Sequence, residues 1–214
     1  MKKVTLSFDN GPDPDTTPQV LDVLARHGVT TTFFVVGERL RDPGRRALCA
    51  RARAEGHLIG NHTYSHIMPL GMSANPDLPA WEIGKAQDLI GTLSEPAPLF
   101  RPSGALGALN DTLFNRQALD YLVAGGYTCV LWNAVPRDWD DPKGWVDRAL
   151  DMCEQQSWPL VVLHDIDTGA MDSLDCFLGE LAQRDMTVVQ KFPPDCVPIV
   201  GGRIVGPVER YVAA

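Results

Sequence analysis

The stretch "LSFDNGPDPDTTP", residues 6–18, contains the transition that decides the fold. An apolar and β-branched run over 4–8 predicts a strand, and it ends in two adjacent polar residues, Asp9 and Asn10. The Thr-Pro pair at 17–18 then supplies a helix N-cap and a favoured first helical residue. A strand, a polar loop and a helix in this order are the first unit of an α/β fold.

Length and composition exclude several classes of protein. The chain has 214 residues, of which 44% are apolar, so a sizeable core is expected and disorder is not. The formal net charge of −8 disfavours nucleic acids and anionic membranes as partners. No apolar run is long enough to span a bilayer, and the N-terminus lacks the apolar segment of a leader peptide. We therefore predict a cytoplasmic protein.

Strand-like and helix-like segments alternate along the rest of the chain. Further strands are predicted over 31–37, 57–62, 98–104, 128–132, 159–165 and 186–190, and further helices over 43–55, 80–94, 110–124, 143–157 and 170–184. Repeated strand–helix units imply parallel strands with right-handed crossovers, in an open sheet or a barrel. One domain is predicted over 1–214, with a tail from about residue 191 that covers the surface.

Polar residues of the types that perform chemistry follow the ends of the predicted strands. In chain order they are Asp9, Asn10, His62, Arg101, Asp138 and His164. The C-terminal ends of parallel strands share one face of an α/β fold, and active sites form on that face. These residues, distant in sequence, are therefore predicted to meet in one site.

Each of these motifs also has a plain structural interpretation. His62 and His66 are four residues apart in "HTYSH", so one helical turn would bring both imidazoles to one metal ion. Two such histidines are also common on an exposed loop, and the Asn-Gly pair after Asp9 is a common turn. Asp138 can instead begin a helix, where the dipole favours acidic side chains. Their joint occurrence at strand ends favours a catalytic site.

Five motifs in order resemble those of the NodB-type polysaccharide deacetylases, carbohydrate esterase family 4. They are "SFDNGP" (7–12), "HTYSH" (62–66), "RPSG" (101–104), "DW" (138–139) and "VVLHD" (161–165). The resemblance extends from residue 4 to about 190. It implies the family's distorted (β/α)7 barrel with outer helices, and an enzyme that removes N-acetyl groups from sugars.

The resemblance also implies a metal site formed by Asn10, His62 and His66, with Zn²⁺ as the expected ion. The family pattern has Asp where this chain has Asn10, so the site lacks one negative charge. Metal affinity should fall, whereas a metal ion that does bind would be a stronger Lewis acid. Asn-Gly sequences also tend to deamidate, which would place Asp at position 10.

The same resemblance assigns the acid–base residues. Asp9 corresponds to the general base, and Arg101 to the residue that orients it. His164 corresponds to the general acid, with Asp138 as its partner. A carboxylate beside an imidazole raises its pKa and fixes the ring, as proton donation to a leaving amine requires.

Four residues are implied in substrate binding: Pro102, Ser103, Trp139 and Leu163. Trp139 and Leu163 resemble the walls of the pocket for the acetyl methyl group, and a backbone N–H near Ser103 would hold the oxyanion. Ser103 replaces an aromatic residue of the family, so a more open groove is expected. The loop over 68–81 departs from the family pattern and is expected to influence substrate choice.

Three functions stay open at this point. The first is a metal-dependent deacetylase of chitin-like oligosaccharides or polysaccharides. The second is a metal-independent amidohydrolase of a small amide or ureide, similar to allantoinase. The third is a non-catalytic carbohydrate-binding relative, although binding alone does not require an acid–base pair.

Overall fold

The computed structural model describes residues 1–104 and 106–213, and within those ranges it is an α/β fold of mostly parallel strands. The strands are β1 (Lys2–Asp9), β2 (Thr32–Val35), β3 (Leu58–Asn61), β4 (Leu99–Phe100), β5 (Thr128–Cys129), β6 (Leu160–His164), β7 (Met186–Val188), β8 (Ile199–Val200) and β9 (Arg203–Ile204). The first seven of these lie within the seven predicted strands or overlap them. The predicted fold class is therefore confirmed.

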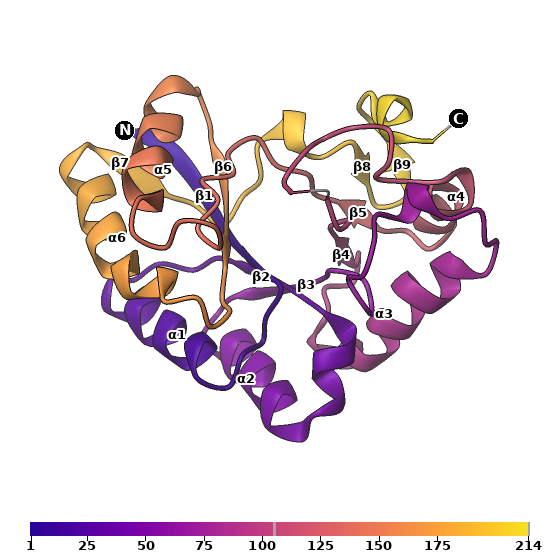
Figure 1. Ribbon diagram of the computed structural model, residues 1–214, viewed down its shortest axis with the longest axis horizontal. Helices are drawn as coiled ribbons and strands as arrows, with labels where there is room; N and C mark the ends of the chain where they lie inside the picture. Colours follow the sequence, from indigo (N-terminus) through magenta and orange to yellow (C-terminus); the bar gives the residue numbers. More distant parts are fainter. Residues whose placement is uncertain (105, 214) are drawn as a thin grey trace.

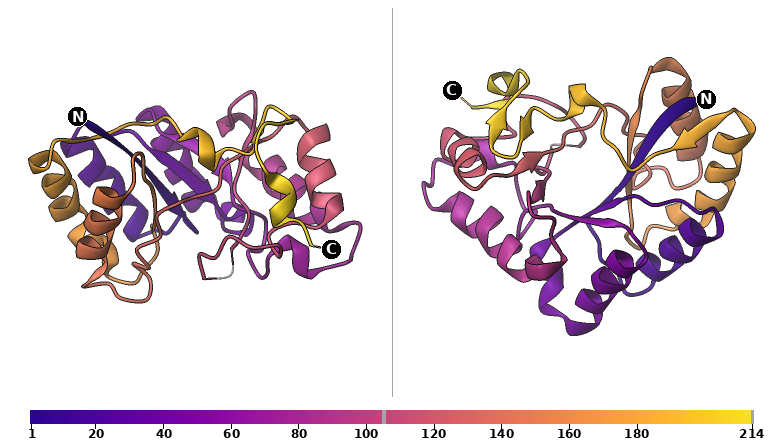
Figure 2. Two further views of the ribbon diagram at one scale, coloured as in Figure 1. Left: turned by 90° about the horizontal axis from the view of Figure 1, so that it is seen from above. Right: turned by 180° about the vertical axis from the view of Figure 1, so that it is seen from behind.

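The α-helices lie on the outside of the curled sheet, as Figure 1 shows. They are α1 (Thr16–Arg26), α2 (Pro43–Ala54), α3 (Lys85–Ile90), α4 (Arg116–Ala124), α5 (Trp145–Gln155) and α6 (Leu174–Gln183). The reverse view in Figure 2 has the same arrangement, with helices at the periphery. An inner sheet whose outer face is covered by helices explains why β6 is apolar up to His164 and buried at every residue.

The strand order places the chemistry-bearing strand ends side by side. Along the sheet the order is β6-β1-β2-β3-β4-β5-β8-β9, and β7 pairs with the first residues of β1. The pairs from β6 to β5 are all parallel. One isolated parallel bridge between Ala134 and Val161 joins the segment after β5 to β6. The ends of β1, β3, β4 and β6 therefore surround one region.

Two hydrophobic clusters pack the sheet against its outer helices. One cluster packs β1 against α1, α5 and α6, and it contains Phe8, Leu21 and Trp145 at 0% exposure. The other packs β4 and β5 against α4, and it contains Phe100 and Leu122, also at 0% exposure. These clusters hold the strand ends in fixed positions, as a preorganised site requires.

Several helices and strands are shorter than predicted. The strands predicted over 98–104 and 128–132 contain only two residues each, and the helix predicted over 110–124 begins at Arg116. Asn115 explains that start, because its side chain accepts a hydrogen bond from the N–H of Ala118 and caps the helix. The predicted helix over 80–94 consists of a π-helical turn (Ala80–Gly84), α3 and a short 3₁₀ turn.

The C-terminal segment does more than cover the surface. β8 pairs antiparallel with β5, and β9 returns beside it as a hairpin. Ile199 and Val208 are fully buried in the second cluster. Among the described residues, no helix combines the length and apolar character that a membrane crossing needs. The predicted cytoplasmic location stays a prediction.

Candidate active site

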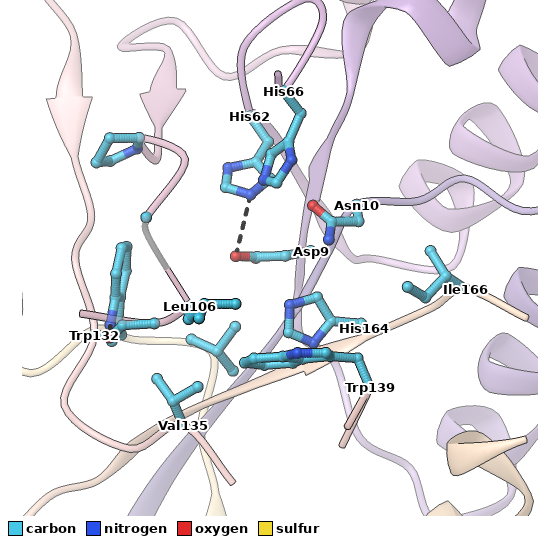
Figure 3. Close-up of a pocket in the computed structure, with 14 residues that line it drawn as sticks. Asp9, Asn10, His62, His66, Leu106, Trp132, Val135, Trp139, His164 and Ile166 are labelled. Atoms are coloured by element: carbon cyan, nitrogen blue, oxygen red, sulfur yellow. Dashed lines mark hydrogen bonds and ion pairs between the residues drawn. The ribbon is translucent and has the colours of Figure 1, made fainter. Parts of the chain in front are cut away.

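Asp9 and His164 are brought together by strand pairing itself. β1 and β6 are parallel neighbours, and Asp9 is the register partner of His164 at their C-terminal ends. Both side chains are largely buried, with residue exposures of 3% for Asp9 and 8% for His164. Figure 3 shows Asp9 between the His62–His66 pair and His164. The structure thus brings these residues together at one place.

Arg101 forms a buried ion pair with the carboxylate of Asp9. It is fully buried, and its Nη1 donates to Oδ1 of Asp9 at 2.7 Å and to Oγ of Ser7 at 2.6 Å. The other guanidinium nitrogens donate to the carbonyls of Val130 and Leu131. A buried ion pair in which every guanidinium nitrogen makes a hydrogen bond fixes the carboxylate in one orientation.

His62 and His66 are neutral nitrogen donors that lie together. Their ring centroids are 4.6 Å apart. Burial lowers the pKa of each imidazole to about 3, and nearby positive charges add to the effect. Nδ1 of His62 lies 2.9 Å from the carbonyl of Arg101, and because a carbonyl only accepts, this nitrogen carries the proton. Nε2 of His62 therefore keeps a free lone pair, as a metal ligand requires.

His164 and Asp138 form a second buried pair. Nδ1 of His164 donates to Oδ1 of Asp138 at 2.8 Å, and the backbone N–H of His164 donates to Oδ2 at 2.8 Å. Burial by itself would lower the pKa of His164, but the hydrogen bond and charge of Asp138 outweigh it, with help from Asp9. The pKa of His164 is therefore raised. Trp139 packs edge-on against the ring at 4.6 Å between centroids.

Asn10 carries an unusual polar atom. Its Oδ1 is buried and has no hydrogen-bond partner among the described residues. In Figure 3 this oxygen is turned toward the two imidazole rings of His62 and His66. Nε2 of His62 and Oδ2 of Asp9, both electron-rich, also face each other at 3.5 Å. These donors fit a divalent cation, which would satisfy the free oxygen and separate the facing lone pairs.

The donor set differs from that of a fully anionic metal site. Within residues 1–104 and 106–213, no cluster of three or more His, Cys, Asp or Glu is arranged to hold a metal ion. Two imidazoles and one amide oxygen are present instead. The site thus has the ligand number of a catalytic metal centre with less negative charge than a carboxylate would give.

The site opens into a cavity of about 230 Å³ with a mainly apolar wall. Beyond the polar residues, the wall consists of Pro102, Gly104, Leu106, Gly107, Trp132, Val135, Trp139, Val162 and Ile166. The predictions for Pro102 and Trp139 therefore agree with the cavity.

Leu163 and the side chain of Ser103 do not line the cavity, whereas an oxyanion-binding backbone N–H near Ser103 stays a prediction. Successive residues of β6 point to opposite faces, so Val162 lines the cavity while Leu163 is buried among the outer helices. Ser103 lies beside the cavity, but its hydroxyl donates to the carbonyl of Met68 at 2.9 Å. Its side chain therefore supports the 68–81 loop and does not line the cavity.

Sequence reasoning missed Glu82, which supports the loop between His62 and His66. Its carboxylate accepts hydrogen bonds from the N–H groups of Tyr64 and Ser65 at 3.0 and 2.9 Å and from the Ser65 hydroxyl at 2.7 Å. Glu82 is only 8% exposed. An acidic residue between Trp81 and Ile83 in an otherwise apolar turn was the available signal.

Fold and site together define a family of hydrolases. The polysaccharide deacetylase family model matches residues 1–130, and the chain belongs to this family. Among curated relatives, the chitooligosaccharide deacetylase of Rhizobium leguminosarum bv. trifolii is 35% identical, over 77% of this chain and 72% of that protein. The peptidoglycan-N-acetylglucosamine deacetylase of Bacillus cereus is 36% identical, over 77% of this chain and 73% of that protein.

Solved structures agree with the sequence comparison. The peptidoglycan deacetylase PdaC of Bacillus subtilis superimposes with a TM-score of 0.69 at 30% identity, over 88% of this chain and 87% of that chain. The chain spans 38% of the full curated PdaC protein. A structure described as T48 deacetylase with substrate gives a TM-score of 0.71 at 26% identity, over 90% and 94% of the two chains.

Proposed function

We propose that this protein is a hydrolase that removes N-acetyl groups from oligo- or polysaccharides containing N-acetylglucosamine. The observation that carries the proposal is the pair of buried dyads, Asp9 with Arg101 and His164 with Asp138, at one cavity. One dyad presents a carboxylate paired with a buried guanidinium, and the other presents an imidazole with a raised pKa. A base and an acid with opposed environments are the requirement for amide hydrolysis.

Each residue then has a defined task in the reaction. Asp9 accepts a proton from the attacking water, while Arg101 holds its other oxygen. His164 donates a proton to the leaving nitrogen, and Asp138 fixes the ring so that Nε2 is left for the substrate. Pro102, Val162 and Trp139 exclude water beside the acyl group.

Asn10, His62 and His66 would hold the divalent metal ion, with Zn²⁺ as the expected ion. Such an ion supplies Lewis-acid polarisation of the carbonyl and a lowered pKa of bound water. The low pKa of both histidines leaves them neutral near pH 7, so no proton competes for their lone pairs. The neutral oxygen of Asn10 weakens this site compared with a carboxylate.

The relatives support the saccharide substrate. Those named above are a chitooligosaccharide deacetylase and a peptidoglycan-N-acetylglucosamine deacetylase, and both names specify N-acetylated aminosugars. The two other functions are less well supported. The named relatives provide no support for a small-amide hydrolase without metal, and a binding protein has no need of two satisfied buried dyads.

Acetate release from N-acetylated chito-oligosaccharides tests the proposal. We expect acetate to be released by protein loaded with Zn²⁺ and the rate to fall after treatment with a chelator, then to return when Zn²⁺ is added back. Release that is unaffected by the chelator would support the metal-independent function. If neither the Zn²⁺-loaded wild type nor the Zn²⁺-loaded Asn10→Asp variant releases acetate, the deacetylase assignment is contradicted.

Asp138→Asn is expected to move the alkaline limb of the pH–rate profile to lower pH. His164 acts as an acid only when protonated, and its raised pKa keeps it protonated to higher pH in the wild type. Loss of the Asp138 charge should lower that pKa, with a shift of roughly 1–3 pH units. The profile of kcat/KM against pH measures this shift. An alkaline limb at the wild-type position would exclude His164 as the titrating acid.

Glu82→Ala is expected to weaken Zn²⁺ binding by about 10- to 100-fold, the usual effect of removing support behind metal ligands. The three hydrogen bonds of Glu82 fix the backbone between His62 and His66. Competition with a chromophoric chelator measures the affinity. Glu154→Ala removes an exposed carboxylate of α5 and should leave the affinity unchanged. Equal affinities of both variants would show that Glu82 does not position the ligands.

A further inference from the structure

We propose that Asn10 is a self-modification site: within the folded protein its side-chain amide is hydrolysed to aspartate through a cyclic imide formed with the nitrogen of Gly11. The conversion would turn the neutral oxygen donor of the metal site into a carboxylate. The inference rests on the proposed function only for its consequence, a stronger metal site. The conversion itself concerns this chain alone.

The fold requires glycine after Asn10, and an asparagine followed by glycine forms a cyclic imide more readily than any other asparagine. A Cβ at position 11 would overlap the buried carboxylate of Asp165. Every larger residue is therefore excluded at this position. Glycine also leaves its own nitrogen unhindered, so this nitrogen can approach the side-chain carbonyl carbon of the preceding residue. Asn at position 10 thus always forms an Asn-Gly pair in this fold.

A proton acceptor is already in place at the attacking nitrogen. The N–H of Gly11 donates to Oδ1 of Asp165 at 3.1 Å, and the hydroxyl of Thr17 donates to the other oxygen at 2.6 Å. Asp165 is 1% exposed, and burial raises the pKa of its carboxyl to about 7, so it accepts a proton more readily than an ordinary aspartate. The deacetylation steps above make no use of Asp165.

The chemistry balances with water as the only co-reactant. The Gly11 nitrogen bonds to Cγ of Asn10 while its proton passes to Asp165. The Cγ–N bond of the amide breaks, and the nitrogen leaves as ammonia with that proton. Water then adds to Cγ and breaks the bond between Cγ and the Gly11 nitrogen, which yields aspartate at position 10 and leaves the peptide bond to Gly11 intact.

The surroundings suit the product as well as the reactant. Asn10 has a φ of 74°, a left-handed conformation that Asn and Asp both tolerate better than other non-glycine residues. Its Oδ1 has no partner among the described residues, so no hydrogen bond holds the amide in place. A carboxylate at this point would face two neutral imidazoles. Isoaspartate would add an atom to the main chain beside the Gly11–Asp165 hydrogen bond and is expected as the minor product.

Mass spectrometry of the intact chain and of its tryptic peptide over 4–26 tests the proposal. Freshly purified protein is incubated at neutral pH, beside a synthetic peptide of the same sequence. We expect a gain of one dalton at Asn10 in the native protein, at least as fast as in the peptide, with aspartate as the main product. An amide that persists in the native protein while the peptide converts would overturn the proposal, as would isoaspartate as the main product.

Three variants separate the causes. Asn10→Gln should keep its mass, because the longer side chain cyclises far more slowly. Asp165→Asn should slow conversion in the folded protein. Thr17→Val should slow it more mildly and serves as the test if Asp165→Asn does not fold. Conversion of both variants at the wild-type rate would overturn the role of Asp165. Asn10→Asp should bind Zn²⁺ roughly 10- to 100-fold more tightly than fresh wild type. Equal affinities would overturn the predicted consequence.

The two proposals fail in distinguishable ways. If Asn10 converts to aspartate but the Asn10→Asp variant releases no acetate, the modification site is supported and the deacetylase proposal is rejected. If the protein releases acetate but keeps Asn10 intact, the deacetylase proposal is supported and the modification site is rejected.

Discussion

His164→Ala is expected to lower kcat for acetate release by about 10²- to 10⁴-fold, the range that a general acid contributes. The leaving nitrogen would then depart without a proton, while Asp9, His62 and His66 stay in place. His164 is 8% exposed at the edge of the cavity, so its removal should cost less stability than removal of a core residue. Acetate release and thermal unfolding, measured on the same samples, check both expectations.

Two further variants sharpen this result. His27 is exposed and pairs with Asp175 on the outer surface, so His27→Gln should retain full activity. His164→Gln keeps a side chain of similar length without an acid near neutral pH, and it should be as inactive as His164→Ala. Activity of His164→Gln near the wild-type level would show that the residue fills space and does not donate a proton.

Arg101→Met is expected to destabilise the protein by about 3–5 kcal/mol, the usual cost of leaving one partner of a buried ion pair. Arg101 is fully buried and donates to Asp9, Ser7 and two backbone carbonyls, all of which would lose their donor. For a chain of this length the loss corresponds to a fall in Tm of roughly 6–20 °C. Activity should fall as well, because the carboxylate of Asp9 is no longer oriented.

The double variant Asp9→Asn with Arg101→Met separates stability from catalysis. Removal of both charges should recover part of the lost stability, since no unpaired buried charge remains, but activity should stay absent. Arg116→Met is the surface control, because Arg116 pairs with Glu209 where both side chains are more than half exposed. Its Tm should change little. A Tm of Arg101→Met equal to that of this control would contradict the buried-pair argument.

The order of the elements was predictable because each strand carries a local signal. Apolar, β-branched runs such as 31–37 and 159–165 are bounded by glycine, proline or polar residues. Strand lengths were less predictable, because pairing partners decide them. At β4 only Leu99 and Phe100 find register partners on β5, although the strand was predicted over 98–104. The β8–β9 hairpin was missed because its two-residue strands have no period to detect.

The polar centre was predictable because parallel strands bring their C-terminal ends to one face. Asp9, Arg101 and His164 follow from that rule together with the family motifs. The apolar wall was less predictable, because the side of a strand on which a residue lies depends on register. Leu163 and Val162 differ by one position and face opposite ways. Glu82 acts through hydrogen bonds to a loop 17 and 18 residues earlier in sequence, and its apolar neighbours indicate burial but not which loop it contacts.

The isolated bridge between Ala134 and Val161 has a consequence for local opening of the molecule. The N–H of Ala134 donates to the carbonyl of Leu160 at 3.1 Å, and the N–H of Val162 donates to the carbonyl of Ala134 at 3.0 Å. This short connection ties the Arg101 side of the cavity to the His164 side. Separation of the two sides would break both hydrogen bonds, so deuterium uptake at these two amides reports how often the cavity widens.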